Sequence, residues 1–496
     1  PICVFRGGFK FLRSWNKKIY VSKQVCLWRS LTSPSTSATN YISLINGQKW
    51  QATAHNGSHP WGPAGNFSNL RVTVATAPGA GTSVVFTVRI GGSDTALTVT
   101  IADTATVATL SGVDAAVTAW QTVTLKCVPT GSPTVSDVSV SVDFDGTTAK
   151  ESGYGCATDQ VVAITRTNRL LFGLDATNWS ASNASDIVSV AGTIKGYGVA
   201  LNIALTTGSI TFRIYKNGTL QDGSGGTVDT RLVFDNTSPT AQQASFSLAV
   251  VAGDLLIFEA AESAADSVTP TWGVLFEATT AGECMLGVCH TSPSQSATVY
   301  ARVTGGNDIA ANATEANTEI PVGGTGFTLS QMQAALNLSP GAGGDGYTFT
   351  LRKNGGAAGP TVSIIDSAVS GSDLSNTASY VSGDLMSMEI SPLVTPAFRA
   401  AGWSFAMNAS PGPAEARWTP IYPDRTVLAA PRPNVGPAVA FFDLEALRGP
   451  PRITQIDAAS MQAPGTLRTT QIDAASMQQP GTLRVTQIDA AALQGR

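Results

Sequence analysis

The chain has 496 residues, of which 43% are apolar and 13% are charged, and this composition excludes a globally disordered protein. Its net charge of −4 provides no field for gripping nucleic acid, and no apolar run reaches the roughly 18 residues of a membrane-spanning helix. Six Cys in this length are too sparse for a disulfide scaffold. We therefore expect several cored domains, with no nucleic-acid partner and no membrane insertion.

Residues 1–39 are predicted to form a basic, aromatic N-terminal arm. Seven Lys and Arg residues occur in 1–31, whereas the first acidic residue of the chain is Asp94. Phe, Trp and Tyr alternate with these cations, and neither a long apolar stretch nor a convincing cleavage site is present. The pattern favours docking on an acidic protein surface over a membrane or nucleic acid.

The middle of the chain holds three similar segments, each an alternating apolar and polar pattern that ends on a Gly. They are 84–92, 210–218 and 347–355, and they align on a shared Phe. The last two end in Lys-Asn-Gly, which supplies the positive φ of a tight hairpin turn. A second strand follows in each copy, opened by Gly-Asp-Leu in the last two and by Trp-Gln-Thr in the first. A repeated β module is the simplest interpretation.

These repeats define three modules, 40–146, 169–278 and 298–408, separated by linkers at 147–168 and 279–297. Many short strands, abundant Gly, Ser and Thr, and little helical periodicity indicate antiparallel β-sandwiches. The predicted fold class is all-β, with three tandem jelly-roll-like β-sandwich domains and extended N- and C-terminal arms.

Alignment of the copies settles two local questions. Residues 329–337 have the best helical pattern in the chain, but they align with 69–76 of the first copy and are therefore predicted as a strand. Trp272 and Trp403 recur at matched positions, which favours packing in the core. Trp61, in a His-Pro-Trp-Gly-Pro loop, has no counterpart and is our best candidate for a ligand contact.

The C-terminal end differs from the modules. Residues 409–451 contain nine prolines and are predicted to form an extended connector. Residues 452–496 are tandem repeats with a period of 16 residues that cannot bury a core alone, so we expect a docking tail that adds strands to a sheet edge. The residues expected at this assembly interface are Ile453, Ile456, Ile472, Val485 and Ile488.

Little in the sequence points to catalysis. His55 and His59 lie in a Gly/Pro loop, where they cannot share a helix face, and Cys284 and Cys289 lack the spacing of a haem or zinc motif. No nucleophile elbow or phosphate-binding loop is present, and the Gly-rich stretches, such as 222–227, are predicted to be turns. We expect no enzyme, no metal and no cofactor.

Carboxylates are the remaining candidates for chemistry. Asp143, Asp145 and Glu277 fall on the last strands of their modules, where a solvated face explains them. A polysaccharide hydrolase would need two of them as an acid/base pair, and it is the least favoured class.

Two segments carry a resemblance to a known group of proteins. Residues 69–101 and 336–355 resemble a Pro-Gly-Ala-Gly plus Phe-Thr-Leu-Arg-Lys-Asn-Gly module of tailed-bacteriophage structural proteins. The order of strand, Lys-Asn-Gly turn and Gly-Asp-Leu strand is similar to the trimeric jelly rolls of the tumour-necrosis-factor and complement type that tip phage fibres. The units at 484–488 are similar to tails on phage virion proteins.

The resemblance implies a non-enzymatic virion structural protein of a tailed phage, located in the extracellular particle. It would assemble through its terminal arms into an oligomeric appendage, a fibre or a shell-decorating element. The implied partners are other virion proteins and other copies of the chain, with a trimer preferred by analogy. The alternative is a carbohydrate-binding receptor-recognition protein or a secreted adhesin, with Trp61 contacting a host-surface glycan.

Overall fold

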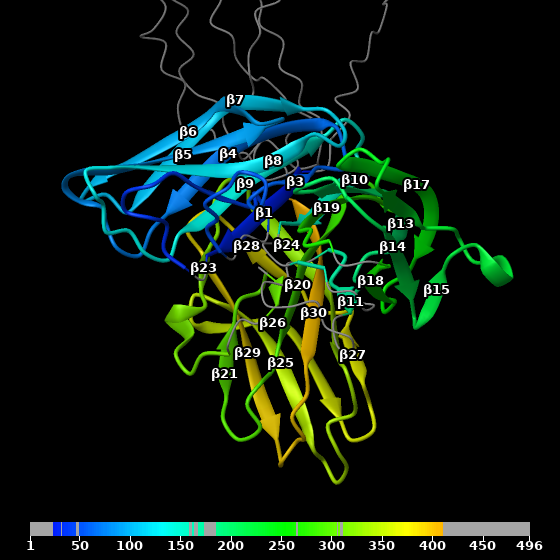
Figure 1. Ribbon diagram of the computed structural model, residues 1–496. Helices are drawn as coiled ribbons and strands as arrows, with labels where there is room; N and C mark the ends of the chain where they lie inside the picture. The colour runs from blue at the N-terminus through cyan, green and yellow to red at the C-terminus, as the bar shows by residue number, and fades with distance from the viewer. Residues whose placement is uncertain are drawn as a thin grey trace, which may run out of the picture. The chain divides into compact units, whose positions relative to one another are not determined.

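The computed structural model describes residues 23–409, apart from 31, 46–48, 158–160, 163–166, 173–184, 264–265, 305 and 308–310. These residues fold into three consecutive β-sandwiches whose strand pairs are antiparallel except for one short pair, and we name them sandwich 1 (23–146), sandwich 2 (151–278) and sandwich 3 (283–409). Figure 1 colours them blue to cyan, teal to green, and yellow-green to orange. The all-β fold predicted from the sequence is confirmed.

Sandwich 1 has a leading sheet of order β1-β9-β4-β7 and a second sheet of order β2-β8-β5-β6, with β3 paired to β8. Its strands are β1 (Lys23–Arg29), β2 (Asn40–Ile42), β3 (His59–Pro60), β4 (Gly65–Thr73), β5 (Gly79–Ile90), β6 (Ser93–Asp103), β7 (Val107–Val117), β8 (Thr122–Thr130) and β9 (Ser139–Gly146).

Sandwich 2 repeats this plan, with a leading sheet of order β10-β19-β13-β17 and a second sheet of order β11-β18-β14-β15 to which β12 and β16 add. Its strands are β10 (Glu151–Cys156), β11 (Thr167–Arg169), β12 (Asp186–Ile187), β13 (Gly192–Leu201), β14 (Ser209–Lys216), β15 (Thr219–Gln221), β16 (Leu232–Asp235), β17 (Ala241–Val250), β18 (Leu255–Glu262) and β19 (Pro270–Ala278), with one 3₁₀ turn, η1 (Ser224–Gly226).

Sandwich 3 has a leading sheet of order β22-β20-β30-β24-β27, with β28 also on β24, and a second sheet of order β21-β29-β25-β26, with β23 on β29. Its elements are β20 (Glu283–Thr291), β21 (Val299–Ala301), β22 (Gly306–Asn307), η2 (Glu315–Asn317), β23 (Ile320–Pro321), β24 (Phe327–Leu336), β25 (Gly346–Lys353), β26 (Gly356–Ile365), β27 (Ser370–Asp373), β28 (Ala378–Tyr380), β29 (Leu385–Leu393) and β30 (Ala401–Ala409).

Each sandwich begins earlier than the sequence predicted. β1 pairs with β9, β10 with β19 and β20 with β30, so the N-terminal arm (1–39) and both linkers (147–168 and 279–297) contribute a strand to a leading sheet. The reason is burial on both sides: β10 is buried from its second residue to its last, so it lacks the polar alternation that reveals a half-exposed strand. The sandwiches therefore begin at residues 23, 151 and 283, and the boundaries expected at residues 40, 169 and 298 are wrong.

The predicted hairpin turns are present. Asn217 and Gly218 have φ of 51° and 77°, and Asn354 and Gly355 have φ of 51° and 78°. Two successive positive φ values are the signature of a type I′ turn, whose twist matches that of the flanking strands.

Residues 329–337 lie almost wholly in strand β24, as the alignment of copies predicted. Gln331 has a φ of 50° and interrupts the pairing register as a β-bulge. The extra residue shifts the alternation, so that Leu329 and Met332 are both buried although they are three residues apart. This shift explains why a strand mimics helical periodicity.

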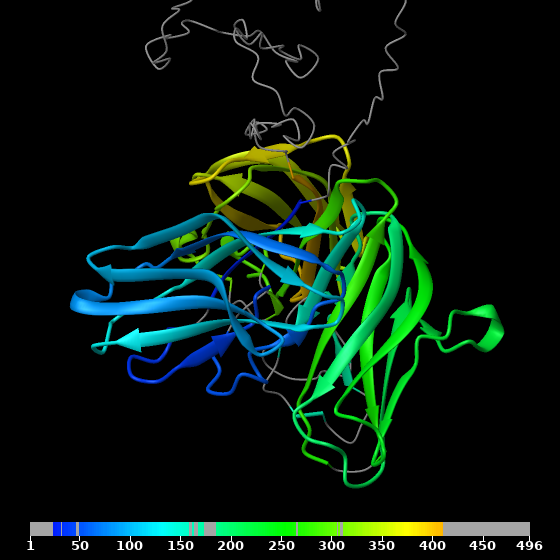
Figure 2. The same ribbon diagram turned by 90° about the horizontal axis from the view of Figure 1, so that it is seen from above.

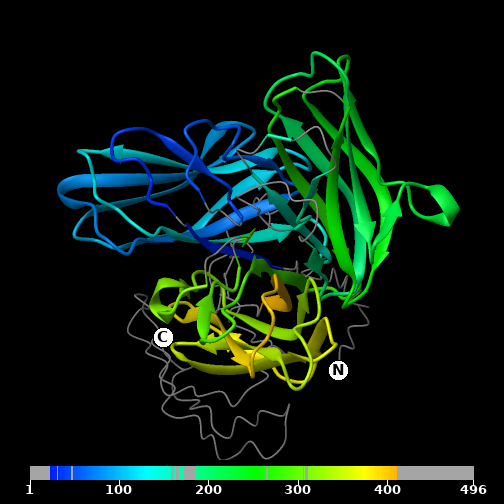
Figure 3. The same cartoon turned by 60° about the horizontal axis from the view of Figure 1, so that its bottom comes forward.

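The buried apolar residues form two clusters. One runs without a break through sandwiches 1 and 2, and the other fills sandwich 3 and includes Val25 and Leu27 from β1 of sandwich 1. Trp272 and Trp403 are fully buried in these clusters, as expected for core residues. Figures 2 and 3 show the three sandwiches from two further directions. The cores are therefore shared across the boundaries between sandwiches.

Candidate assembly site between the sandwiches

The sandwiches contact one another through equivalent short strands. β3, β12 and β23 each pair with the strand that follows the Gly-Asp-Leu turn or its counterpart, at the same register. β3 lies against the leading sheet of sandwich 2, β12 against that of sandwich 3, and β23 against β1 of sandwich 1. The contacts therefore run from 1 to 2, from 2 to 3 and from 3 back to 1, a closed cycle within one chain.

Glycines on the leading sheet of sandwich 2 make the first junction possible. A Cβ added to Gly273 would lie 1.6 Å from the carbonyl oxygen of Pro60, and one added to Gly153 would lie 2.6 Å from the indole carbons of Trp61. Contacts this short are impossible for real side chains. Gly273 and Gly153 thus form a flat backbone surface on which the His-Pro-Trp segment of sandwich 1 lies.

Trp61 is part of this junction and is completely buried. Its ring packs against Phe67 and Phe144, with centroid distances of 5.0 and 4.8 Å. The expectation that Trp61 is displayed in a surface loop to hold a ligand is therefore wrong. The loop has the Gly/Pro composition of an exposed segment, and the glycines that receive the ring lie far along the sequence.

Trp120 explains why the first copy lacks the Gly-Asp-Leu turn. It occupies the left-handed position that Gly253 occupies in sandwich 2, with a φ of 66° against 92°. A Cβ on Gly198 of sandwich 2 would lie 2.8 Å from Trp120 Cε3, so the indole lies against that glycine. The Trp120 amide also donates to the carbonyl of Trp61 at 2.6 Å, and the Trp61 amide donates to that of Gln121 at 2.8 Å. The residue that departs from the repeat, Trp120, therefore contacts sandwich 2 at the first junction.

The second junction joins β12 to sandwich 3. Ser404 Oγ, on β30, donates a hydrogen bond to the carbonyl of Ile187 at 2.6 Å. Nearby in the leading sheets, the Met285 amide donates to Tyr154 Oη at 2.7 Å, and this hydroxyl donates back to the Met285 carbonyl at 3.2 Å. At this junction, a side-chain hydroxyl of each sandwich forms hydrogen bonds with main-chain groups of the other.

The third junction is more polar and is centred on Asp143. This carboxylate accepts from Thr325 Oγ1 of sandwich 3 at 2.6 Å and from Asn69 Nδ2 at 2.8 Å. A Cβ on Gly323 would lie 2.9 Å from Ser141 Cβ. Asp143 is fully buried, so its expected place on a solvated strand face is wrong. Its strand is covered on that side by the loop after β23.

Strand β1 is held by both other sandwiches. The side-chain amide of Gln24 donates to the carbonyl of Gly153 at 2.7 Å, and its oxygen accepts from the Gly153 amide at 3.0 Å. Arg29 Nη1 donates to the carbonyl of Glu319 at 2.9 Å, and Arg302 Nη1 donates to the Arg29 carbonyl at 2.7 Å. The segment expected to be an N-terminal docking arm is, over 23–29, a strand of sandwich 1 that contacts both other sandwiches.

One position differs instructively among the three junctions. His59, Asp186 and Ile320 occupy the same register and are all fully buried. Burial lowers the pKa of His59 to about 3, and its Nδ1 lies 3.1 Å from Ser43 Oγ. Burial raises the pKa of Asp186 to about 8, although the Phe172 amide donates to its carboxyl at 2.7 Å. Both side chains are therefore neutral at pH 7 in the folded chain.

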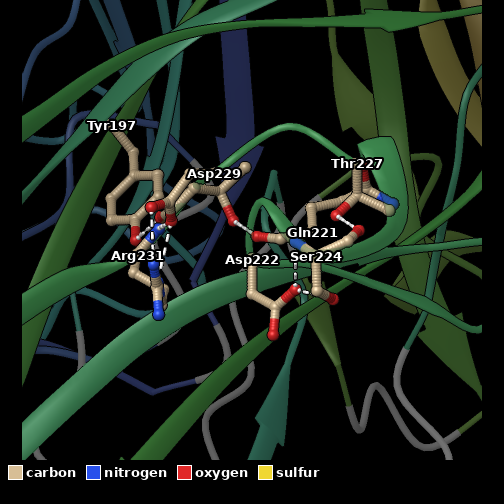
Figure 4. A network of polar contacts seen from close by, with 8 residues as sticks. Tyr197, Gln221, Asp222, Ser224, Thr227, Asp229 and Arg231 are labelled. Atoms are coloured by element: carbon tan, nitrogen blue, oxygen red, sulfur yellow. Dashed lines mark hydrogen bonds and ion pairs between the residues drawn. The ribbon is translucent and has the colours of Figure 1, made fainter.

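The Gly-rich stretch at 222–227 forms turns, as expected, in an exposed loop between β15 and β16 (Figure 4). Asp222 accepts from the Ser224 amide at 3.0 Å, and Arg231 pairs with Asp229 at 2.7 Å. Tyr197 Oη anchors the loop by donating to the Thr230 carbonyl at 2.6 Å. These contacts account for the shape of the loop without a ligand.

The other residues tested for chemistry do not converge. Within the described residues, no group of three His, Cys, Asp or Glu side chains is placed to hold a metal ion. His55 Nε2 lies 3.2 Å from the carbonyl of Thr269, whereas His59 is inside the first junction. Cys284 is buried, and burial raises the pKa of its thiol. The side chain of Cys289 lies outside the described residues.

The residues proposed for the tail interface lie outside the part of the chain that the structure describes. They are Ile453, Ile456, Ile472, Val485 and Ile488. No helix within the described ranges is long and apolar enough to cross a membrane. Neither a family model nor a curated protein matches the chain.

Proposed function

We propose that this protein is a non-enzymatic structural component of a tailed-phage virion, in which one chain supplies a body of three sandwiches and its tail links that body to neighbouring copies. The observation that carries the proposal is the closed cycle of junctions from sandwich 1 to 2 to 3 and back to 1. The sequence resemblance supports the virion setting.

The cycle of junctions resembles a closed head-to-tail oligomer, in which each subunit binds the next through two different surfaces. Three identical chains related by rotation would form three identical junctions between different surfaces. Here the three modules are covalently joined, so each junction has its own chemistry while the register of β3, β12 and β23 is retained. In this proposal one chain provides the arrangement that the resemblance assigns to a trimer.

The residues that could have carried chemistry serve packing in this arrangement. His59 and Trp61 are buried in the first junction, and Asp143 is buried in the third. Their burial favours a mechanical role over catalysis. It also removes Trp61 as the contact for a glycan, so no observation favours the carbohydrate-binding alternative.

The test compares the full chain with a chain that ends at residue 451. We expect sedimentation to show concentration-dependent association of the full chain and a single 51.1 kDa mass at high dilution. The shortened chain should remain a monomer and unfold cooperatively at the same temperature.

Particles produced from a genome that encodes the full chain should contain it. Particles produced from a genome that encodes only the shortened chain should lack that chain. Particles that lack the full chain, or that incorporate the shortened chain equally well, would contradict the proposal.

A further inference from the structure

Two strands at equivalent places leave long backbone edges open. Among the described strands, β7 pairs with β4 alone and β17 with β13 alone. β7 spans 11 residues and β17 spans 10, and neither contains Lys, Arg or Pro; the one charge in the pair is Asp114. Natural sheets usually protect an open edge with such residues or by interrupting the strand. A β-bulge interrupts each strand, opposite Asn69 in β7 and opposite Lys195 in β17, but no Lys, Arg or Pro of the strand itself protects either edge.

The side chains beside these edges are incompletely covered. Phe246 and Ala244 of β17, and Leu110 of β7, pack against the core but remain half-buried. The Phe246 ring lies 5.6 Å from the ring of the fully buried Tyr197, but Phe246 itself is only half-buried. An additional strand along β17 would complete the burial of these apolar groups.

Sandwich 3 shows what a protected edge looks like. Its equivalent strand is divided into β27 and β28, and Asp373 is the last residue before the break. Asp373 accepts from the Thr361 amide of β26 at 2.9 Å and from Asn376 Nδ2 at 2.8 Å, so it fastens the edge to the other sheet. Lys353 Nζ also donates to the Ser379 carbonyl at 2.8 Å. Lys216 makes the same kind of contact on β17, where it donates to the carbonyl of Ala249 at 2.9 Å, so the two edges differ in the break and in the contacts of Asp373.

We propose that the tandem repeats at 452–496 of one copy bind as added β-strands along the open edges of β7 and β17 of a neighbouring copy. This inference rests on the proposed function, in which the tail links copies, and it assigns the surface that receives the tail.

The repeat has the chemistry that these edges require. Each unit contains Thr-Gln-Ile-Asp-Ala-Ala, which in an extended conformation places Thr454, Ile456 and Ala458 on one face and Gln455 and Asp457 on the other. The Ile would pack beside the half-buried apolar groups while the Gln and Asp face water.

The chain is long enough to reach a second copy. After β30 ends at Ala409, residues 410–451 provide 42 residues before the first repeat, and these span up to about 140 Å when extended. Successive repeats begin 16 residues apart, so one tail can offer a strand to both edges.

Hydrogen–deuterium exchange of the full chain tests the proposal, at a concentration where it associates and at high dilution. We expect the peptides that cover β7 and β17 to exchange about tenfold or more slowly when associated, and to lose this protection on dilution or when the chain ends at 451. The peptide that covers β28 should not change.

A matched pair of tail variants sharpens the test without touching the sandwiches. Replacing Ile456, Ile472 and Ile488 by Asp should abolish the protection, whereas replacing Gln455, Gln471 and Gln487 by Glu adds the same charge and should preserve it.

Association that depends on the tail without protection of β7 and β17 would overturn this inference while leaving the proposed function standing. Protection that persists at high dilution would place the tail on its own copy and would overturn the inference as well. A full chain that never associates would contradict the proposed function itself.

Discussion

The first and third junctions join the same kinds of surface in different ways. At the first, Pro60 and Trp61 lie on a glycine surface, and the apolar core runs on from sandwich 1 into sandwich 2. At the third, hydrogen bonds from Thr325 and Asn69 meet the buried Asp143, and sandwich 3 keeps a largely separate core. The difference shows that covalently linked copies can diverge at each junction. We expect sandwiches 1 and 2 to behave as one cooperative unit to which sandwich 3 is docked.

Filling the glycine surface should have the largest effect. Gly273→Val would drive a side chain into the Pro60 carbonyl, and we expect the free energy of unfolding to fall by about 4 kcal/mol because the junction cannot close. Denaturant unfolding measures the change. Gly356→Ala is the control, because the nearest atom to its added Cβ is 3.6 Å away. Equal losses in the two variants would contradict the account of the first junction.

Removing the ionisable group at the second junction should change how the free energy of unfolding depends on pH between about 4 and 8. Folded Asp186 releases its proton near pH 8, whereas the unfolded side chain does so near its ordinary value of 3.8. The folded chain therefore binds more protons between these values, and its stability should fall as the pH rises from about 4 to 8, by about 4–5 kcal/mol. Asp186→Asn should flatten this part of the stability profile. A variant profile that kept the parent slope would refute the assignment.

The first junction should respond to acid instead. Folded His59 takes up a proton only near pH 3, whereas the unfolded side chain does so near 6.5. The unfolded chain binds more protons in this window, so stability should fall by about 2–3 kcal/mol as the pH drops from 6.5 to 4. His59→Gln should remove that component. Urea titrations at several pH values measure both slopes, and an unchanged acid slope would count against burial of a neutral His59.

The smallest effect is expected at the third junction. Thr325→Val removes one donor from the buried Asp143, and we expect a loss of about 1–2 kcal/mol with unchanged cooperativity in sandwiches 1 and 2. Thr328→Val is the matched control, because its hydroxyl contacts Ser379 at an exposed position. A larger loss for the control would show that the Asp143 contact does not hold sandwich 3.

The sequence predicts the repeated sandwich because the relevant signals are local. The positive φ of Asn217 and Asn354 follows from the Lys-Asn-Gly turns, and alignment of the copies identifies β24 as a strand despite its helical pattern. Strands β1, β10 and β20 have no polar alternation to indicate a half-exposed strand, because the side chains described for them are almost all buried.

The candidate site was harder to predict than the fold. The composition of the loop around Trp61 predicts an exposed side chain, but Gly153 of another sandwich receives its ring and Gly273 receives the neighbouring Pro60. One signal in the sequence did mark the junction: the first copy replaces the Gly of its Gly-Asp-Leu turn by Trp120, a costly choice at a left-handed position. A repeat that breaks its own rule at a strained residue is a sign of a new contact.

The closed cycle is tested most directly by a cross-link across the third junction, between sandwich 3 and sandwich 1. A Cβ on Gly323 lies 2.9 Å from Ser141 Cβ, slightly closer than the roughly 3.8 Å of a disulfide, so a small shift would allow the bond. The account predicts that the double variant Ser141→Cys, Gly323→Cys forms this disulfide within one chain at high dilution, as identified by peptide mass mapping. Free thiols at both positions, or a bond formed only between chains, would contradict a cycle that closes within a single copy.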